Sequence, residues 1–258
     1  MEKTYKARFH HYGAMIDEMR LLIRYYEPSL PKSEWVQFVI DRNLLGKASR
    51  WWVKELITGV FYPRFVNGEV GNAVLHLKVL ESKNANVDII RSIMYFHTAL
   101  NDAFLYDFVT LCLFEKYFSG QISISAKDVY QFILETPTEK FNNPWSEYIK
   151  HRLSRGVMAT LRDFGILEGK ARKQIANYHL PLETFVYVAF LLSEQVSSGE
   201  KMLAHPHWRL FLLTPRIVER MFLRAHQTGY LNYHAAGGVI RINFNFSNVE
   251  EFLHGIRF

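Results

Sequence analysis

The sequence predicts a mainly α protein, with a helical bundle followed by two winged helix-turn-helix units that carry short β-hairpin wings. Apolar residues recur at three- and four-residue spacing through the first 120 residues, which is typical of amphipathic helices. After residue 145 a helix, a glycine and a small hairpin follow in order, and the same order returns about sixty residues later. The expected units are residues 1–120, 121–181 and 182–258.

Six helices are expected in the N-terminal bundle, because proline, glycine and polar clusters separate six amphipathic stretches. They span residues 14–27, 33–43, 48–61, 69–82, 87–99 and 102–118. Aromatic residues lie at helical spacing among the aliphatic ones, which favours core packing over stacking on single-stranded nucleic acid. These residues are Trp35, Phe38, Trp51, Phe104, Phe108 and Phe114.

The second and third of these helices are joined by a short turn that contains Gly46. Two helices on such a turn fit a helix-turn-helix, and they equally fit a plain αα-hairpin. Arg50 and Lys54 are expected to be exposed on the third helix, and Arg64 to be exposed just after it. In the helix-turn-helix interpretation, Arg50 and Lys54 are candidate DNA contacts.

The middle unit begins with a predicted strand near Ser123 that enters a capped helix ending near Leu134. A longer helix is expected from about Trp145 to Phe164, because apolar residues fall on one side of it at about 100° per residue. That apolar stripe consists of Ile149, Leu153, Val157, Leu161 and Phe164. His151, Arg155 and Arg162 are expected on the opposite, solvent-facing side and Arg152 on the flank, and all four are candidate DNA contacts.

Gly165 ends the predicted helix, and residues 166–175 then read as two short strands around a basic tip. Lys170, Arg172 and Lys173 lie at that tip. Long cationic side chains at a hairpin tip can reach phosphate at little packing cost. The order of helix, glycine and hairpin is that of a winged helix-turn-helix.

Positive charge is concentrated in this middle unit. The whole chain has a net charge of +6, from 31 Lys and Arg against 25 Asp and Glu. Residues 145–175 contain seven bases and three acids, whereas residues 61–120 contain five bases and six acids. Such a cluster fits a surface that faces phosphate, and it also fits a solvated helix face.

The C-terminal unit repeats the same order of elements. Thr214 and the proline after it predict the start of a helix, and residues 239–244 alternate in polarity like a half-buried strand. Arg216 and Arg220 are expected to point outward from the helix, and Arg241 to lie on the polar face of the strand. These three cations are further candidate DNA contacts.

The order of several landmarks resembles the BrxA family of bacteriophage-exclusion (BREX) defence islands. The landmarks are residues 43–49 (NLLGKAS), 63–65 (PRF), 145–146 (WS), 163–167 (DFGIL) and the segment 213–229. The resemblance implies a small, non-enzymatic, largely helical protein that binds nucleic acid within a multi-component anti-phage system. Some members are labelled membrane proteins, whereas the longest apolar runs here fall short of the roughly 20 residues that a bilayer span needs.

Catalytic and cofactor motifs are missing from the sequence, which has no phosphate-binding loop, dinucleotide-binding turn, zincin helix or nucleophile elbow. We therefore expect no enzymatic activity, no cofactor and no small-molecule substrate. His205 and His207 lack a third metal ligand, so we expect no metal site. The polar N-terminus and the single Cys112, expected to be a small buried hydrophobe, fit a cytoplasmic protein that does not contact the membrane.

The function that the sequence favours is binding of double-stranded DNA, mainly through phosphates, by release of condensed counterions. Sequence preference is expected to be weak, because Asn and Gln are scarce on the outward face of the basic helix. The alternative is an interaction scaffold whose winged helices bind other BREX proteins, since this fold serves both purposes.

Overall fold

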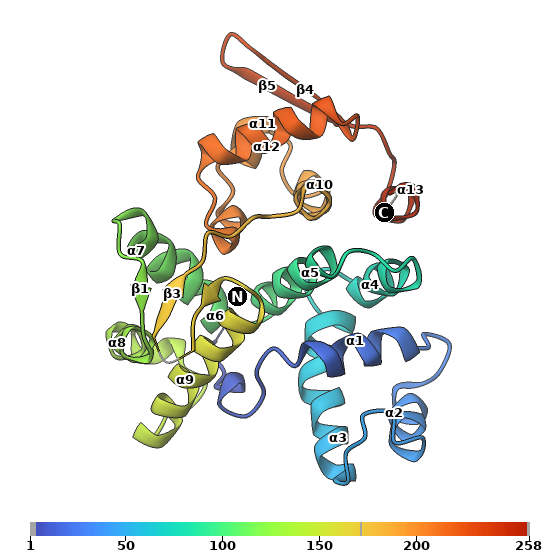
Figure 1. Cartoon of the computed structure of the whole chain (residues 1–258), viewed down its shortest axis with the longest axis vertical. Coiled ribbons are helices and arrows are strands. Elements are labelled where there is room, and N and C mark those ends of the chain that lie inside the picture. The colour runs from blue at the N-terminus through green and yellow to red at the C-terminus, as the bar shows by residue number, and fades with distance from the viewer. Residues whose placement is uncertain (1–3, 171, 257–258) are drawn as a thin grey trace.

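The computed structural model describes residues 4–170 and 172–256, so Ala171 of the predicted basic tip lies outside the described residues. Helices dominate, and the strands form only one small three-stranded sheet and one two-stranded hairpin within the described chain (Figure 1). The predicted mainly α class with short hairpins is therefore confirmed. No described helix combines the length and the apolar character that crossing a bilayer requires.

The N-terminal bundle contains the predicted helices, with shifts of a few residues at their ends. Its α-helices are α1 (Ile16–Tyr25), α2 (Lys32–Asp41), α3 (Arg50–Leu56), α4 (Ala73–Ser82), α5 (Val87–Leu100), α6 (Ala103–Asp107) and α7 (Phe114–Phe118). Two π-helical stretches, η2 (Ile57–Val66) and η3 (Phe108–Leu113), extend α3 and join α6 to α7. A single 3-10 turn, η1 (Arg8–His10), precedes α1.

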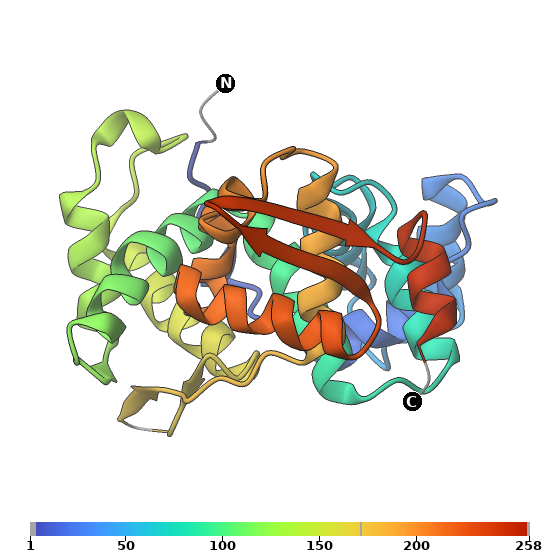
Figure 2. The same ribbon diagram turned by 90° about the horizontal axis from the view of Figure 1, so that it is seen from above.

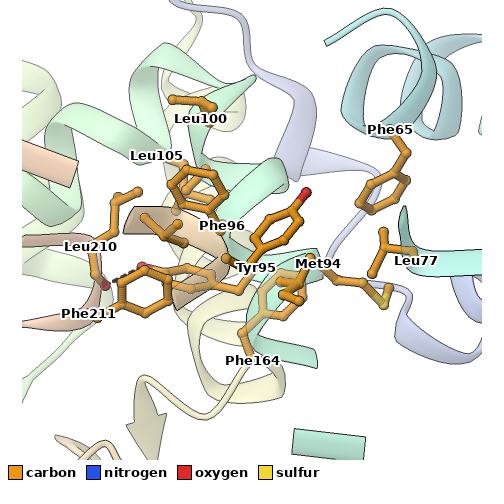
Figure 3. Close-up of a cluster of buried hydrophobic side chains, with 14 of the residues drawn as sticks. Phe65, Leu77, Met94, Tyr95, Phe96, Leu100, Leu105, Phe164, Leu210 and Phe211 are labelled. Atoms are coloured by element: carbon orange, nitrogen blue, oxygen red, sulfur yellow. Dashed lines mark hydrogen bonds between the residues drawn. The ribbon is translucent and has the colours of Figure 1, made fainter. Parts of the chain in front are cut away.

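The centre of the core is α5, in which every residue from Ser92 to Leu100 is buried. Figure 3 shows Tyr95 and Phe96 of this helix packed among side chains from all three predicted units, including Phe164 and Phe211. The Tyr95 hydroxyl donates a hydrogen bond to the Leu210 carbonyl at 2.9 Å. The buried side chains therefore form one continuous core.

Arg64 is buried, so the expectation that it would be exposed was wrong. Its guanidinium donates hydrogen bonds to the carbonyl oxygens of Gly13 and Ala14, at 3.0 and 3.2 Å. Burial lowers the pKa of Arg64 to about 10, which still leaves it charged at neutral pH. The helical pattern could not reveal this, because the covering segment lies about fifty residues earlier in the chain.

The middle unit contains two helices and a three-stranded antiparallel sheet. These elements are β1 (Ser123–Ile124), α8 (Ala126–Glu135), α9 (Glu147–Asp163), β2 (Leu167–Glu168) and β3 (Lys173–Ile175), with a 3-10 turn η4 (Thr138–Lys140) between the helices. The strand order is β1-β3-β2, so the predicted hairpin gains a third strand from the start of the unit. Ser125 and Asp128 form a capping box that begins α8, as the sequence indicates.

The C-terminal unit comprises α10 (Leu182–Ser193), α11 (Gly199–Leu203), the 3-10 helix η5 (Pro206–Phe211), α12 (Pro215–Gln227), β4 (Leu231–Ala236), β5 (Val239–Phe244) and α13 (Val249–Gly255). Thr214 caps α12 through the Ile217 N–H. The β4–β5 hairpin turns through Gly237 and Gly238, both with positive φ. Figures 1 and 2 show this hairpin lying along α12 at one end of the molecule.

Candidate nucleic-acid interface

Helix α9 has the two faces that its sequence predicts. Ser146 caps its N-terminus by accepting a hydrogen bond from the Ile149 N–H. Leu153, Val157 and Leu161 are completely buried on one side. His151, Arg155 and Arg162 are exposed on the other side, and Arg152 is half-buried between the faces. The apolar stripe therefore anchors the helix and leaves a basic face toward solvent.

A groove of about 410 Å³ brings together cations from α9 and from the β2–β3 hairpin. Arg155 lines it from the helix, and Arg172 and Lys173 line it from the hairpin. The remaining wall consists of Met158 and residues 123–126, and no described lining residue carries a carboxylate. Within the described chain, neither Arg155 nor Arg172 takes part in an ion pair. The described lining of the groove therefore carries three basic side chains and no acidic one, and the nearby Asp128 carboxylate, hydrogen-bonded to Ser125, is paired with Lys116.

The hairpin owes its shape to a glycine and to a hydrogen bond across its tip. Gly169 has φ +88°, and a side chain there would collide with the Arg172 carbonyl oxygen. The Lys173 ammonium donates to the Lys170 carbonyl at 3.1 Å, while the Lys170 side chain is exposed. Figure 2 shows the hairpin projecting from the edge of the molecule beside α9. Lys170 and Arg172 can therefore approach a large ligand.

Aromatic side chains position two of the predicted DNA contacts in the N-terminal half of α9. Arg152 donates a hydrogen bond to the Tyr148 hydroxyl at 2.9 Å and lies 5.7 Å from the centre of that ring. His151 stacks on Tyr130, with ring centroids 4.6 Å apart and an interplanar angle of 9°. Neither tyrosine was singled out by the sequence, because an aromatic residue on a helix surface is more often a packing residue.

Two basic residues of this helix are already paired with acids. The Lys150 ammonium lies 2.8 Å from a Glu147 oxygen, and this hydrogen bond is the largest cause that lowers the pKa of Glu147. Arg162 lies 2.6 Å from Asp163, and both side chains are partly exposed. The positive potential of α9 is therefore stronger at Arg155 than at Arg162.

The chain segment before α1 packs directly onto α9. Gly156 permits this contact, because a side chain there would collide with the Phe9 carbonyl oxygen. His11, whose ring centroid lies 3.7 Å from that of His10, is thereby brought within reach of the Arg152 charge. Burial is the largest cause that lowers the pKa of His11, followed by the charges of His10 and Arg152. The sequence offered no signal for this proximity.

Helix α3 carries Arg50 and Lys54 on its exposed side, as predicted. Arg50 forms an exposed ion pair with Asp41 at 2.9 Å, whereas Lys54 has no ion pair among the described residues. Trp51 is 69% exposed, so its assignment to the core was wrong. The physical reason is that α3 packs through Val53 and Leu56, and Trp51 faces away from them. The other five aromatic residues of that set are buried or half-buried.

The C-terminal cations lie on other elements. Arg216 and Arg220 are exposed on α12, and Arg241 is exposed on β5 opposite His234 of β4. Arg224, which the sequence analysis missed, continues the same side of α12 at four-residue spacing and is also exposed. None of these four residues lines the groove at α9. Figure 1 places α12 and its hairpin at the end of the molecule away from α9.

Residues with the chemistry of metal sites have structural roles here. Asp102 is the N-cap of α6 and accepts a hydrogen bond from the Leu105 N–H, and His205 caps η5. Cys112 is half-buried, and burial raises the pKa of its thiol. The described residues contain no group of three or more His, Cys, Asp or Glu side chains that could hold a metal ion.

Comparison with models of protein families identifies the family of this chain. The family model described as BrxA matches residues 3–191, about three quarters of the chain. The chain belongs to the BrxA family. Membership makes it a component of BREX phage defence. No curated protein matches the chain.

The part that matches the BrxA family contains α9, the three-stranded sheet and the α2–α3 pair. Arg155, Arg172 and Lys173 therefore lie in the segment shared with other BrxA proteins. Arg216, Arg220 and Arg241 lie beyond residue 191, outside the matched segment. The predicted DNA contacts at α9 thus lie within the part of the chain that matches the BrxA family, whereas those of the C-terminal unit lie outside it.

Proposed function

We propose that this member of the BrxA family is a non-enzymatic component of BREX defence that binds double-stranded DNA, mainly through its phosphates. The observation that supports this most strongly is the groove between α9 and the β2–β3 hairpin, where Arg155, Arg172 and Lys173 converge without a carboxylate. A phosphate of the duplex in this groove would meet three cations at once, and these cations would replace the counterions condensed on the DNA.

The order of elements around this groove supports a winged-helix interpretation. Helix α7, strand β1, helices α8 and α9, and strands β2 and β3 follow one another as in a helix-turn-helix with a hairpin wing. In that interpretation α9 lies along a groove of the duplex and the hairpin contacts the adjacent backbone. The exposed side chains of α9 are Glu147, Tyr148, His151, Arg155 and Arg162, and they include no Asn or Gln that could read adenine, so base readout is expected to be weak.

A titration of random-sequence duplex across several salt concentrations tests this function. The logarithm of affinity should fall linearly with the logarithm of salt concentration, with a slope of about −0.9 for each phosphate contacted. Duplexes of different sequence should bind with nearly the same affinity. Failure to retain duplex at low salt would refute DNA binding by this protein.

The C-terminal unit favours a second candidate function, the binding of another BREX protein. Leu223 on α12 is 42% exposed and Val239 on β5 is 58% exposed, beside the cations of that unit. Apolar residues exposed next to charges are typical of protein interfaces. Replacing Leu223 with Asp should weaken co-purification with the other BREX proteins and leave duplex binding unchanged.

The two candidate surfaces can be ranked by charge-matched variants. Replacing Arg216 and Arg220 together with Ala should lower duplex affinity by less than about threefold, because these residues lie outside the groove at α9. The matched variant replaces Arg155 and Arg172, which removes the same charge from the groove. Binding measured at one salt concentration on folded proteins compares them. A larger defect from the α12 pair would move the main DNA surface to the C-terminal unit.

A further inference from the structure

The first turn of α3 carries an exposed tryptophan within a segment rich in bases. Trp51 is 69% exposed, the largest exposed fraction among the large hydrophobic residues of the described chain. Residues 42–54 contain four bases and no acid. The bases are Arg42, Lys47, Arg50 and Lys54. A single exposed apolar residue is common on protein surfaces, so it is the combination of the exposed indole with four neighbouring bases that points to a ligand.

The bases around Trp51 are available to an incoming anion. Lys54 follows Trp51 by three residues, so both side chains lie on the same side of α3. Arg50 and Lys47 pair with Asp41 and Glu18 at 2.9 and 3.3 Å. These cations are about half exposed or more, and such exposed pairs are weak enough for a phosphate to replace the carboxylates.

A chain of neighbouring side chains connects this surface to α9. Arg152 lies close to His11, whose ring lies 6.2 Å from that of Tyr12. Tyr12 in turn lies 6.2 Å from Trp52, and the Lys47 ammonium lies 5.5 Å from the Trp52 ring. Figure 1 shows α3 and α9 at the same end of the molecule, with the N-terminal segment between them. The α2–α3 turn and the first turn of α3 therefore extend the surface proposed to bind duplex.

The chemistry of the indole ring indicates what Trp51 would contact. Its single N–H donor cannot make the paired hydrogen bonds that read the edge of a base pair. An exposed indole face flanked by cations is instead suited to stack on an unpaired base while the cations hold the adjoining phosphates. Stacking of this kind does not depend on sequence, in agreement with the weak base readout expected at α9.

We propose that Trp51 stacks on an unpaired base, so that the protein binds a duplex with a single-stranded extension more tightly than a blunt duplex. The inference deepens the proposed DNA-binding function and rests on it. In this arrangement the groove at α9 contacts the paired region, and Arg42, Lys47, Arg50 and Lys54 contact phosphates of the extension. The ligand is thus the junction between paired and unpaired DNA.

The test compares a blunt duplex with the same duplex carrying a short single-stranded extension, for the full-length protein and its variants. The unaltered protein should bind the extended duplex about tenfold more tightly, in the range that stacking on one base supplies. Trp51→Ala should bind both substrates with the affinity for the blunt duplex, and Trp51→Phe should keep most of the gain. The control is Val87→Ala, which changes an exposed apolar residue at the start of α5, and this variant should keep the full gain in affinity for the extended duplex.

The outcomes separate this inference from the proposed function. Equal affinity of the unaltered protein for both substrates would overturn the inference, as would equal weakening of both by Trp51→Ala. Either result would leave duplex binding through α9 in place. Loss of all DNA binding on replacing Trp51, with an unchanged melting temperature, would also overturn it, because Trp51 would then contact paired DNA. If the unaltered protein binds neither substrate, the proposed function itself fails.

Discussion

Replacing Arg155 and Arg172 together with Ala is expected to lower the affinity for blunt duplex by roughly 50-fold at 0.1 M salt, because two phosphate contacts are lost. The two guanidinium groups line one groove, and neither has a carboxylate partner among the described residues. The slope of log affinity against log salt concentration should become shallower by about 1.8, the value for two contacts. Fluorescence anisotropy across a salt series measures both quantities.

Stability should be nearly unaffected in this double variant. Both side chains are exposed, and exposed surface substitutions usually change the free energy of unfolding by less than about 0.5 kcal/mol. An unchanged melting temperature would therefore assign the binding defect to lost contacts. An unchanged slope and affinity would exclude the groove as the DNA surface. Arg162→Ala should have a smaller effect than either groove arginine alone, because Asp163 already compensates its charge.

Acid is expected to destabilise the protein through a buried histidine. The free energy of unfolding should fall by about 2 kcal/mol between pH 7 and pH 5, since His97 is completely buried and its pKa is lowered from 6.5 to about 3. Burial is the largest cause of this shift, and the charge of His76 adds to it. The unfolded chain binds a proton at this residue below about pH 6.5, whereas the folded chain does not. Stability is therefore highest above pH 6.5 and declines as pH falls.

The hydrogen bonds around His97 explain why its charged form is disfavoured. Its Nε2 lies 2.7 Å from the Tyr187 hydroxyl, which also lies 3.0 Å from Nδ1 of His76. The Nδ1 atom of His97 is buried and has no hydrogen-bond partner among the described residues. A second N–H at that atom would therefore be left unsatisfied in the core.

Urea unfolding from pH 7 to pH 5 measures this effect. His97→Phe removes the titrating group, so its stability should decline less steeply over that range even if it starts lower at pH 7. His179→Ala, which changes an exposed histidine, should follow the unaltered protein. Parallel curves for His97→Phe and the unaltered protein would show that another group causes the acid sensitivity.

The sequence by itself determined the elements whose signals are local. The apolar stripe of α9 and the start of this helix near Trp145 come from residues within a few positions of one another, and the structure has both. The same is true of the Thr214 cap and of the alternating strand at residues 239–244. The prediction that Arg155 and Arg162 of α9 are exposed while its aliphatic stripe is buried is also confirmed, because helical periodicity decides which side is apolar.

Only the tertiary structure decided which side chains are covered and which cations meet. Arg64 is buried because residues 13 and 14 cross over its helix, and Trp51 is exposed because no distant segment packs on that side of α3 in the described chain. Arg155 and Arg172 line the same groove because β3 of the hairpin pairs with β1. The position of His11 next to α9 depends on the contact between Phe9 and Gly156. Sequence periodicity shows which face of a single helix or strand is apolar. A binding site combines residues from several elements that are far apart in the sequence, and no local pattern shows that these elements are in contact.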